Sequence, residues 1–120
     1  MNGIQSLIAA LGISLFATAT AAGSFEATSA DKDLQALVTR WAQSEGKKIV
    51  WEATGNAAIK DAEALNSSAQ MRKATTFAQA LQRLNMSLEA ARVDTALVAC
   101  VFNDAIVIRT IDQPPCGSPL

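Results

Sequence analysis

Residues 40–52, RWAQSEGKKIVWE, contain both tryptophans of a 120-residue chain that has no tyrosine and no histidine. The hydrophobic spacing of the chain changes at Gly46 in the middle of this stretch. Before the glycine, apolar residues recur at helical spacing. After it they alternate, which places Ile49 and Trp51 on one side of an extended chain. The stretch therefore predicts a helix that ends at a glycine cap, followed by a strand that returns along it.

The helix before Gly46 is expected to span about 31–45, with Ser29 or Asp31 as its N-cap. Trp41 continues the apolar stripe of this helix, so core packing explains its ring better than an aromatic binding platform does. Trp51 lies near the end of the strand, and we treat it as a candidate contact for a partner. The predicted core residues of this first half are Leu34, Leu37, Val38, Trp41 and Ile49.

A second helix is predicted to begin after Thr75 or Thr76, either of which can cap it, and to end at Asn85. Residues on its apolar face recur at spacings of three and four. The members of this face that we assign to the core are Phe77, Leu81 and Leu84.

The run TALVACVFNDAIVIRTI consists of two apolar, β-rich segments divided by Asn103 and Asp104. Both of these residues tolerate the positive φ of a two-residue hairpin turn. A turn at this position would place Cys100 opposite Val107 across the hairpin. The run therefore predicts the last two strands of the sheet.

Three segments give weaker signals. Residues 25–28 alternate over a short distance and predict at most a short strand, and residues 53–75 mix turn residues with helix formers. Within that region, 59–65 favour a helix, and a strand at 70–74 would extend the sheet. The predicted fold class is α+β, a small βαββαβ(β) sandwich with two helices on one face of a mixed sheet of three to five strands.

The first 25 residues carry no charge, and a strongly apolar part at 7–16 is followed by the small residues Ala19, Thr20 and Ala21. This pattern predicts that residues 1–21 are a cleaved signal peptide and that 22–120 form a single exported domain. The alternative is a membrane anchor. A span needs about 20 apolar residues, so we expect no stable membrane span after processing.

Export into an oxidising compartment would permit a disulfide between Cys100 and Cys116. One buried strand thiol and one free thiol in the tail explain the two cysteines equally well. Pro114 and Pro115 lack amide donors, so residues 112–120 cannot continue a central strand. We expect a proline-rich tail that is either flexible or tethered by the disulfide.

The residue types present in the chain argue against catalysis and against metal binding. Without histidine, the chain cannot form a Ser-His-Asp or Cys-His arrangement, and two thiols alone cannot make a zinc site. The formal net charge is −1, and dispersed Lys and Arg make no footprint for nucleic acid. We therefore expect no catalytic, cofactor-binding or metal-binding residues, no cofactor and no nucleic-acid partner. The remaining class is a non-enzymatic domain, which would bind a partner through a sheet edge or an outer helix face.

Three segments, DLQALVTRWAQSEGKKIVWE, TTFAQALQRL and LVACVFNDAIVIRTI, resemble the C-terminal domain family of toxin co-regulated pilus biosynthesis protein Q. The most specific part is the equal spacing of Trp41, Gly46 and Trp51. That family is similar to the short amino-terminal ring domains of secretins.

The resemblance implies a periplasmic accessory of a type IV pilus or of a conjugative type IV secretion apparatus, which docks on a secretin or an envelope core-complex subunit. The alternative is a small periplasmic ligand-binding or sensory domain, in which Trp41 and Trp51 would line a pocket.

Overall fold

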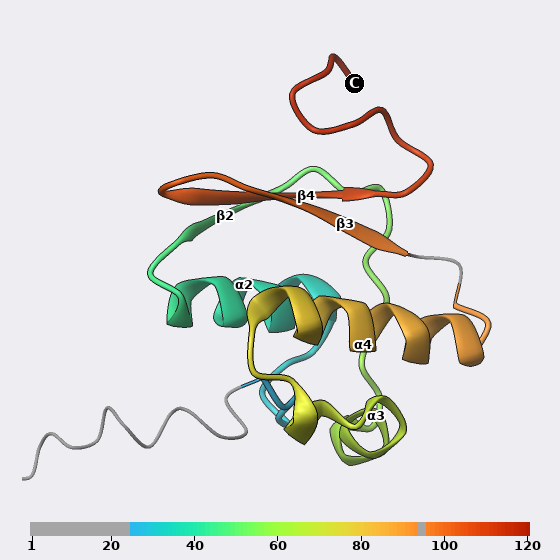
Figure 1. Ribbon diagram of the computed structural model, residues 1–120. Helices are drawn as coiled ribbons and strands as arrows, with labels where there is room; N and C mark the ends of the chain where they lie inside the picture. The colour runs from blue at the N-terminus through green and yellow to red at the C-terminus, as the bar shows by residue number, and fades with distance from the viewer. Residues whose placement is uncertain (1–24, 94–95) are drawn as a thin grey trace, which may run out of the picture.

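The structure is a computed structural model that describes residues 25–93 and 96–120 (Figure 1). The predicted signal peptide at 1–21 lies outside these residues. The elements along the chain are the helix α2 (Leu34–Ser44), the strand β2 (Lys48–Trp51), the helix α3 (Ala62–Ala69), a 3-10 turn (Met71–Lys73), the helix α4 (Phe77–Ala90) and the strands β3 (Leu97–Val101) and β4 (Ala105–Thr110).

The three strands form one mixed sheet in the order β2-β4-β3. The central strand β4 pairs in parallel with β2 and antiparallel with β3. In Figure 1, α2 and α4 lie under one face of the sheet, α3 lies below these two helices, and the C-terminal tail passes above the opposite face. This arrangement confirms the predicted α+β class, with two helices on one face of a mixed sheet.

The glycine in the opening stretch ends α2 as predicted. Gly46 has a φ of +73° and donates its N–H to Gln43 O at 3.0 Å. The next residue, Lys47, donates its N–H to Ala42 O at 3.0 Å. These two bonds satisfy the last carbonyls of the helix and require a residue in the left-handed region, which glycine adopts without steric cost. The chain then turns directly into β2.

The start of α2 differs from the prediction. Its N-cap is Asp33, whose carboxylate accepts the backbone N–H of Ala36 at 2.8 Å. Neither Ser29 nor Asp31 caps the helix. The carboxylate of Asp31 is already engaged by Thr28 and Arg40, so it is not free to bond the first turn.

The core extends from the sheet through the α2–α4 layer to α3, the 3-10 turn and the segment before α2. Trp41 is 0% exposed, and its ring meets Phe25 and Phe77 edge-on at centroid distances of 5.8 and 6.5 Å. Ile49 is only partly buried and packs against this core. The other predicted core residues are all buried, namely Leu34, Leu37, Val38, Trp41, Phe77, Leu81 and Leu84.

Residues 70–74 do not form the strand that would have extended the sheet. The backbone of Gln70 is left-handed, with φ 52°, and a 3-10 turn follows it. Met71 and Ala74 are buried and stand three residues apart, which is a helical rather than an alternating spacing. The predicted helix at 59–65 begins later, at Ala62, because Asp61 caps α3 by accepting the N–H of Ala64.

Residues 25–28 do not form a strand either. The backbone of Ala27 bonds to a side chain of α3: its N–H donates to Asn66 Oδ1 at 2.6 Å, and its carbonyl accepts from Asn66 Nδ2 at 2.9 Å. A side-chain amide thus supplies the hydrogen bonds that a neighbouring strand would otherwise make. The segment is therefore fixed on the helical side of the molecule.

Helix α4 begins as predicted but is longer. Thr76 caps it by accepting the N–H of Gln79 at 3.1 Å. The helix runs through Asn85, the predicted end, to Ala90. Arg92 rather than a glycine takes the left-handed position beyond the end, with φ 59°. The sequence thus lacks the glycine that usually marks such an end.

The hairpin register is confirmed, since Cys100 pairs with Val107. The turn also lies where it was predicted, with Phe102 N–H donating to Ala105 O at 2.8 Å. However, neither Asn103 nor Asp104 has positive φ. A contact from outside the hairpin supports the turn, because Lys47 Nζ donates to Phe102 O at 2.7 Å.

Candidate docking surface

Strand β3 is an edge strand, because β4 is its only neighbour in the described sheet. Phe102 directs its N–H toward β4, where it bonds Ala105. Residues of an antiparallel strand direct their backbone groups alternately to one side and the other. The N–H and C=O groups of Leu97, Ala99 and Val101 therefore point away from β4, out of the sheet edge.

A side chain from α4 occupies the first of these positions. Asn85 Nδ2 donates to Leu97 O at 2.8 Å, and Leu97 N–H donates to Asn85 Oδ1 at 2.9 Å. No hydrogen bond from a described residue reaches the outward backbone groups of Ala99 and Val101. Two residues of the edge therefore remain able to pair.

A groove of about 660 Å³ runs between α4 and this edge, and we call it the α4–β3 groove. Its lining is mostly apolar, and three of its large hydrophobic members are strongly exposed: Met86 at 63%, Val101 at 58% and Ile111 at 69%. Glu89 is the single charged residue among those that line it. Apolar exposure of this kind beside unpaired backbone is typical of an interaction surface.

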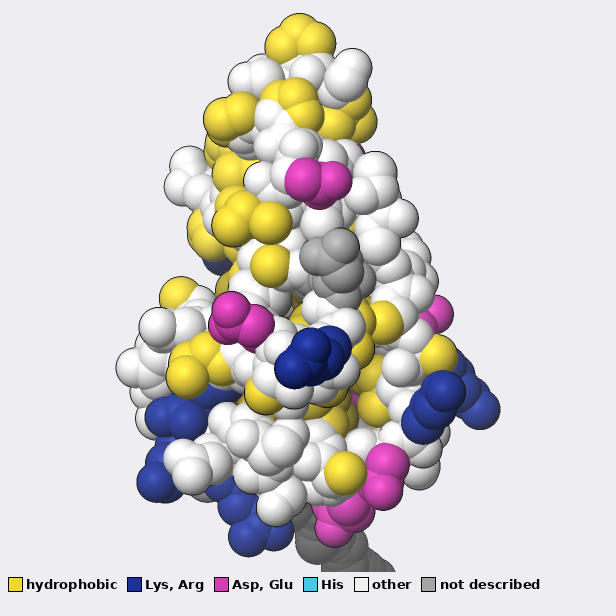
Figure 2. Space-filling view, turned by 90° about the vertical axis from the view of Figure 1, so that its right-hand side faces the viewer, with side chains coloured by type: hydrophobic (Ala, Val, Ile, Leu, Met, Phe, Trp, Pro, Cys, Tyr) yellow, Lys and Arg dark blue, Asp and Glu magenta, His cyan; other side chains and the backbone are white. Residues whose placement is uncertain are grey.

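Figure 2 views the molecule from the side where α4 ends and β3 begins. Most of the Lys and Arg side chains in this view lie in its lower half, over the helices. Hydrophobic side chains are more prominent above them, toward the C-terminal tail. In the lower half, hydrophobic side chains also lie between the charged ones.

Trp51, the candidate partner contact, lies on the other edge strand, β2. It is partly buried and packs against the core. Neither Trp51 nor Trp41 lines the α4–β3 groove or the other three hollows found in the described part of the chain. The two rings are therefore not brought together into one pocket there.

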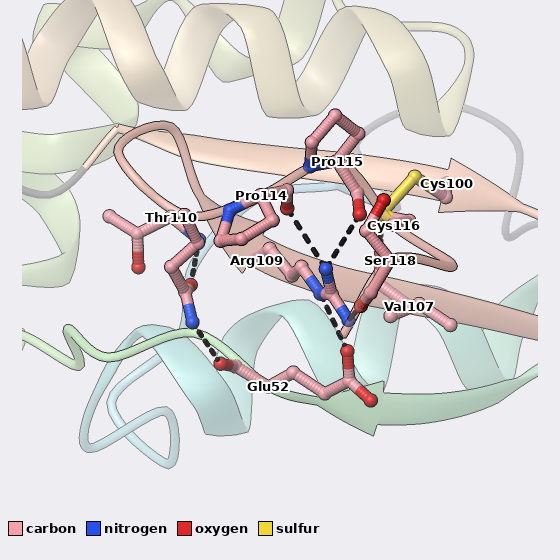
Figure 3. Close-up of a disulfide and its surroundings, with 10 residues drawn as sticks. Glu52, Cys100, Val107, Arg109, Thr110, Pro114, Pro115, Cys116 and Ser118 are labelled. Atoms are coloured by element: carbon pink, nitrogen blue, oxygen red, sulfur yellow. Dashed lines mark hydrogen bonds and ion pairs between the residues drawn. A yellow bond between two sulfur atoms is a disulfide. The ribbon is translucent and has the colours of Figure 1, made fainter. Parts of the chain in front are cut away.

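The outer face of the sheet is covered by the C-terminal tail. A disulfide joins Cys100 of β3 to Cys116 of the tail, with their Cα atoms 6.1 Å apart (Figure 3). Of the two alternatives left open by the sequence, the tethered tail is the one that the structure contains.

Arg109 organises the covered face. It is 5% exposed, and its Nε donates to Glu52 Oε1 at 2.7 Å (Figure 3). Its Nη1 donates to Pro114 O and Pro115 O at 2.9 and 2.6 Å, and its Nη2 donates to Ser118 O at 2.8 Å. The tail is thus wrapped around one guanidinium group, which supplies the donors that the carbonyls of the tail need.

Sequence reasoning missed this role for Arg109. The available signal was a single cation in an otherwise apolar strand, directly followed by a tail rich in proline. A cation there needs acceptors if it is to be buried. The tail can supply carbonyl oxygens because its prolines prevent it from pairing as a central strand, which leaves these carbonyls without strand partners.

A second ion pair holds the segment before α2. Arg40 donates from Nη2 to Asp31 Oδ2 at 2.8 Å and from Nε to Asp31 Oδ1 at 3.1 Å, and Nη2 also donates to Glu26 O at 2.6 Å. Burial by itself raises the pKa of Asp31. The hydrogen bonds from Arg40 and Thr28 and the charge of Arg40 outweigh burial, so the pKa lies below its usual value.

Replacement of Asp31 by asparagine is expected to cost about 1.5 to 3 kcal/mol of stability at neutral pH, since it removes a charged acceptor. A lowered pKa in the folded state stabilises the fold above the unfolded value of about 3.9, and this contribution is lost as the pH falls through the folded-state pKa. The difference between wild type and Asp31→Asn should therefore shrink in acid. Urea denaturation at a series of pH values checks this, and a difference independent of pH would contradict it.

The structure is thus a small α+β domain in which the tail covers the outer face of the sheet and the α4–β3 groove borders the β3 edge. Over residues 23–112, the chain matches the family described as toxin co-regulated pilus biosynthesis protein Q, and it belongs to this family. Comparison with curated proteins and with solved structures gave no match. The chain is accordingly a protein of pilus biosynthesis.

The match ends at residue 112, so Cys116 and the rest of the disulfide-tethered tail lie beyond the matched residues. Both the α4–β3 groove and the spacing of Trp41, Gly46 and Trp51 lie within the match. Within the described ranges, no helix combines the length and apolarity that crossing a bilayer requires. The relation to secretin ring domains stays a prediction.

Proposed function

We propose that the protein is a non-enzymatic, periplasmic accessory of a type IV pilus or of a conjugative type IV secretion apparatus, and that it docks on a secretin or an envelope core-complex subunit. Membership of a pilus biosynthesis family supports the pilus assignment. The disulfide between Cys100 and Cys116 supports an oxidising compartment such as the periplasm.

The observation that carries the docking proposal is the α4–β3 groove beside an unpaired strand edge. Met86 and Val101 expose large apolar side chains there, and no described residue covers them. The opposite face of the sheet is covered by the tail and by the bonds of Arg109. The groove is therefore the apolar surface best placed for a partner protein.

The alternative of a ligand-binding or sensory domain has less support. It requires both tryptophans to line a pocket, but Trp41 is fully buried between two phenylalanines. Trp51 remains a proposed partner contact at the β2 edge. Its ring is only partly buried, whereas the ring of Trp41 has no exposed surface to offer a ligand.

Co-purification from the native host with an affinity-tagged secretin, and in parallel with an affinity-tagged core-complex subunit, tests the proposal. We expect Val101→Lys to lower the recovered protein by about tenfold or more, because it would bury an unpaired charge in the interface. Phe102→Lys is the matched control, since Phe102 is the next residue, is 50% exposed and does not line the groove. Trp51→Ala tests the other edge separately.

Recovery of wild type and Phe102→Lys, but not of Val101→Lys, would support docking through the groove. If the wild-type protein is recovered with neither the secretin nor a core-complex subunit, the proposed function is wrong. Loss of binding in Trp51→Ala alone would move the docking site to the β2 edge.

A further inference from the structure

We propose that the partner supplies an extended strand, which adds to the β3 edge in the α4–β3 groove and pairs with Ala99 and Val101. This inference rests on the proposed function, because it names the part of the partner that the docking surface recognises. The partner is identified by its chemistry as a strand with apolar side chains on one face and no acidic side chain directed at the groove.

The backbone of the edge provides the first argument. Ala99 and Val101 each direct an N–H and a C=O out of the sheet, in the alternating pattern that an incoming strand matches. An added helix could not pair with these groups, because its own backbone groups are already bonded to one another. A strand would satisfy all of them at once.

Asn85 provides the second argument. Its side-chain amide donates to Leu97 O and accepts from Leu97 N–H, which are the two kinds of bond that a backbone amide of a neighbouring strand would make. The amide reaches this edge from α4, across the groove. The outward groups of β3 are thus accessible from inside the groove, and the protein already pairs the first of them with a peptide-like group.

The residues that line the groove determine which types of side chain the incoming strand can carry. A strand that pairs with Ala99 directs every second side chain toward α4, where Leu81 and Met86 contribute apolar surface. The one charged lining residue is Glu89. Charge complementarity therefore excludes acidic residues facing the groove and favours a basic residue at the end near Glu89.

The β2 edge is less suited to strand addition. It begins at Lys48, directly after Lys47, whose Nζ already binds Phe102 O. Lysine side chains on an edge strand discourage pairing with another strand. None of the four hollows found in the described part of the chain is lined by a residue of β2, whereas Ala99 and Val101 of β3 line the α4–β3 groove.

The test uses the exported, oxidised protein to select from a library of random twelve-residue peptides displayed on phage. We expect enriched peptides to alternate apolar and polar residues, to lack acidic residues on the apolar face and to carry a basic residue at one end. Changing that basic residue to glutamate should weaken binding to wild type. The same change should matter much less in Glu89→Gln.

Amide hydrogen exchange measured by NMR gives a readout on the unaltered protein. The N–H groups of Ala99 and Val101 should exchange fast in the free protein and slowly when the selected peptide is bound. Ala99→Pro removes one outward donor from an edge position that tolerates proline and should weaken peptide binding about tenfold. Ala99→Ser keeps the donor and should bind like wild type.

Failure of the library to yield a binder, or a bound peptide that leaves the Ala99 and Val101 amides unprotected, would overturn the inference. Slow exchange of these amides in the free protein together with a dimer mass would also overturn it, since a second copy would then be the occupant. If the secretin still co-purifies in any of these cases, only the strand addition is wrong and the proposed function stands.

Discussion

Replacing Trp41 by alanine is expected to cost about 3 to 5 kcal/mol of stability. The side chain is 0% exposed and touches Phe25 and Phe77, so the substitution leaves a cavity between the α2–α4 layer and the segment before α2. Small domains have a total stability of about 5 to 15 kcal/mol, and at the lower end of this range the variant would be unfolded. Thermal denaturation followed by far-UV circular dichroism measures the loss.

Trp41→Phe is the matched control. Phenylalanine keeps an aromatic ring next to Phe25 and Phe77, so it leaves a much smaller cavity than alanine does. We therefore expect Trp41→Phe to retain most of the stability that Trp41→Ala loses. Equal melting temperatures for Trp41→Ala and wild type would contradict the burial of this ring.

Removal of the disulfide by the double substitution Cys100→Ser and Cys116→Ser is expected to cost about 3 kcal/mol, because the bond closes a loop with a sequence separation of 16. Without the disulfide, noncovalent contacts alone hold the tail, among them the hydrogen bonds from Arg109 to the carbonyls of Pro114 and Pro115. Urea denaturation with and without a thiol reductant measures the change.

The reductant should lower the denaturation midpoint of the wild type and leave that of the double variant unchanged. Under reducing conditions the two proteins should become equally stable. A midpoint of the wild type that does not respond to full reduction would show that the tail is held without the covalent bond. In that case the hydrogen bonds of Arg109 would be sufficient to hold the tail.

Hydrophobic spacing predicted the elements whose apolar faces repeat within one segment. The stripe through Leu37 and Trp41 indicated α2, and Gly46 indicated its end, because a left-handed cap favours glycine whatever packs around it. The hairpin register followed from the position of Asn103 and Asp104 between two apolar runs. These features depend on neighbours close in the chain.

The features that were not predicted depend on contacts between distant residues. The backbone of Ala27 bonds Asn66 instead of a strand, and Asp31 is drawn away from capping α2 by Arg40. The side chain of Asn85 bonds Leu97 and does not end helix α4. The position beyond the actual end of the helix is occupied by Arg92, so no glycine signals that end in the sequence. In each case a side chain replaces a backbone partner, and nothing in the local spacing shows it.

For the candidate site, too, some features could be predicted from the sequence and others depend on contacts between distant residues. From the sequence by itself we predicted that the chain binds rather than catalyses, because it has no histidine or tyrosine, and that Trp41 belongs to a core stripe. Only the tertiary structure decided which sheet edge is open. It places the tail over the outer face around Arg109 and leaves Ala99 and Val101, beside α4, without a backbone partner on their outer side among the described residues. The reason is physical: periodicity reports which face of an element is apolar, whereas the pairing of a strand edge depends on which distant groups reach it.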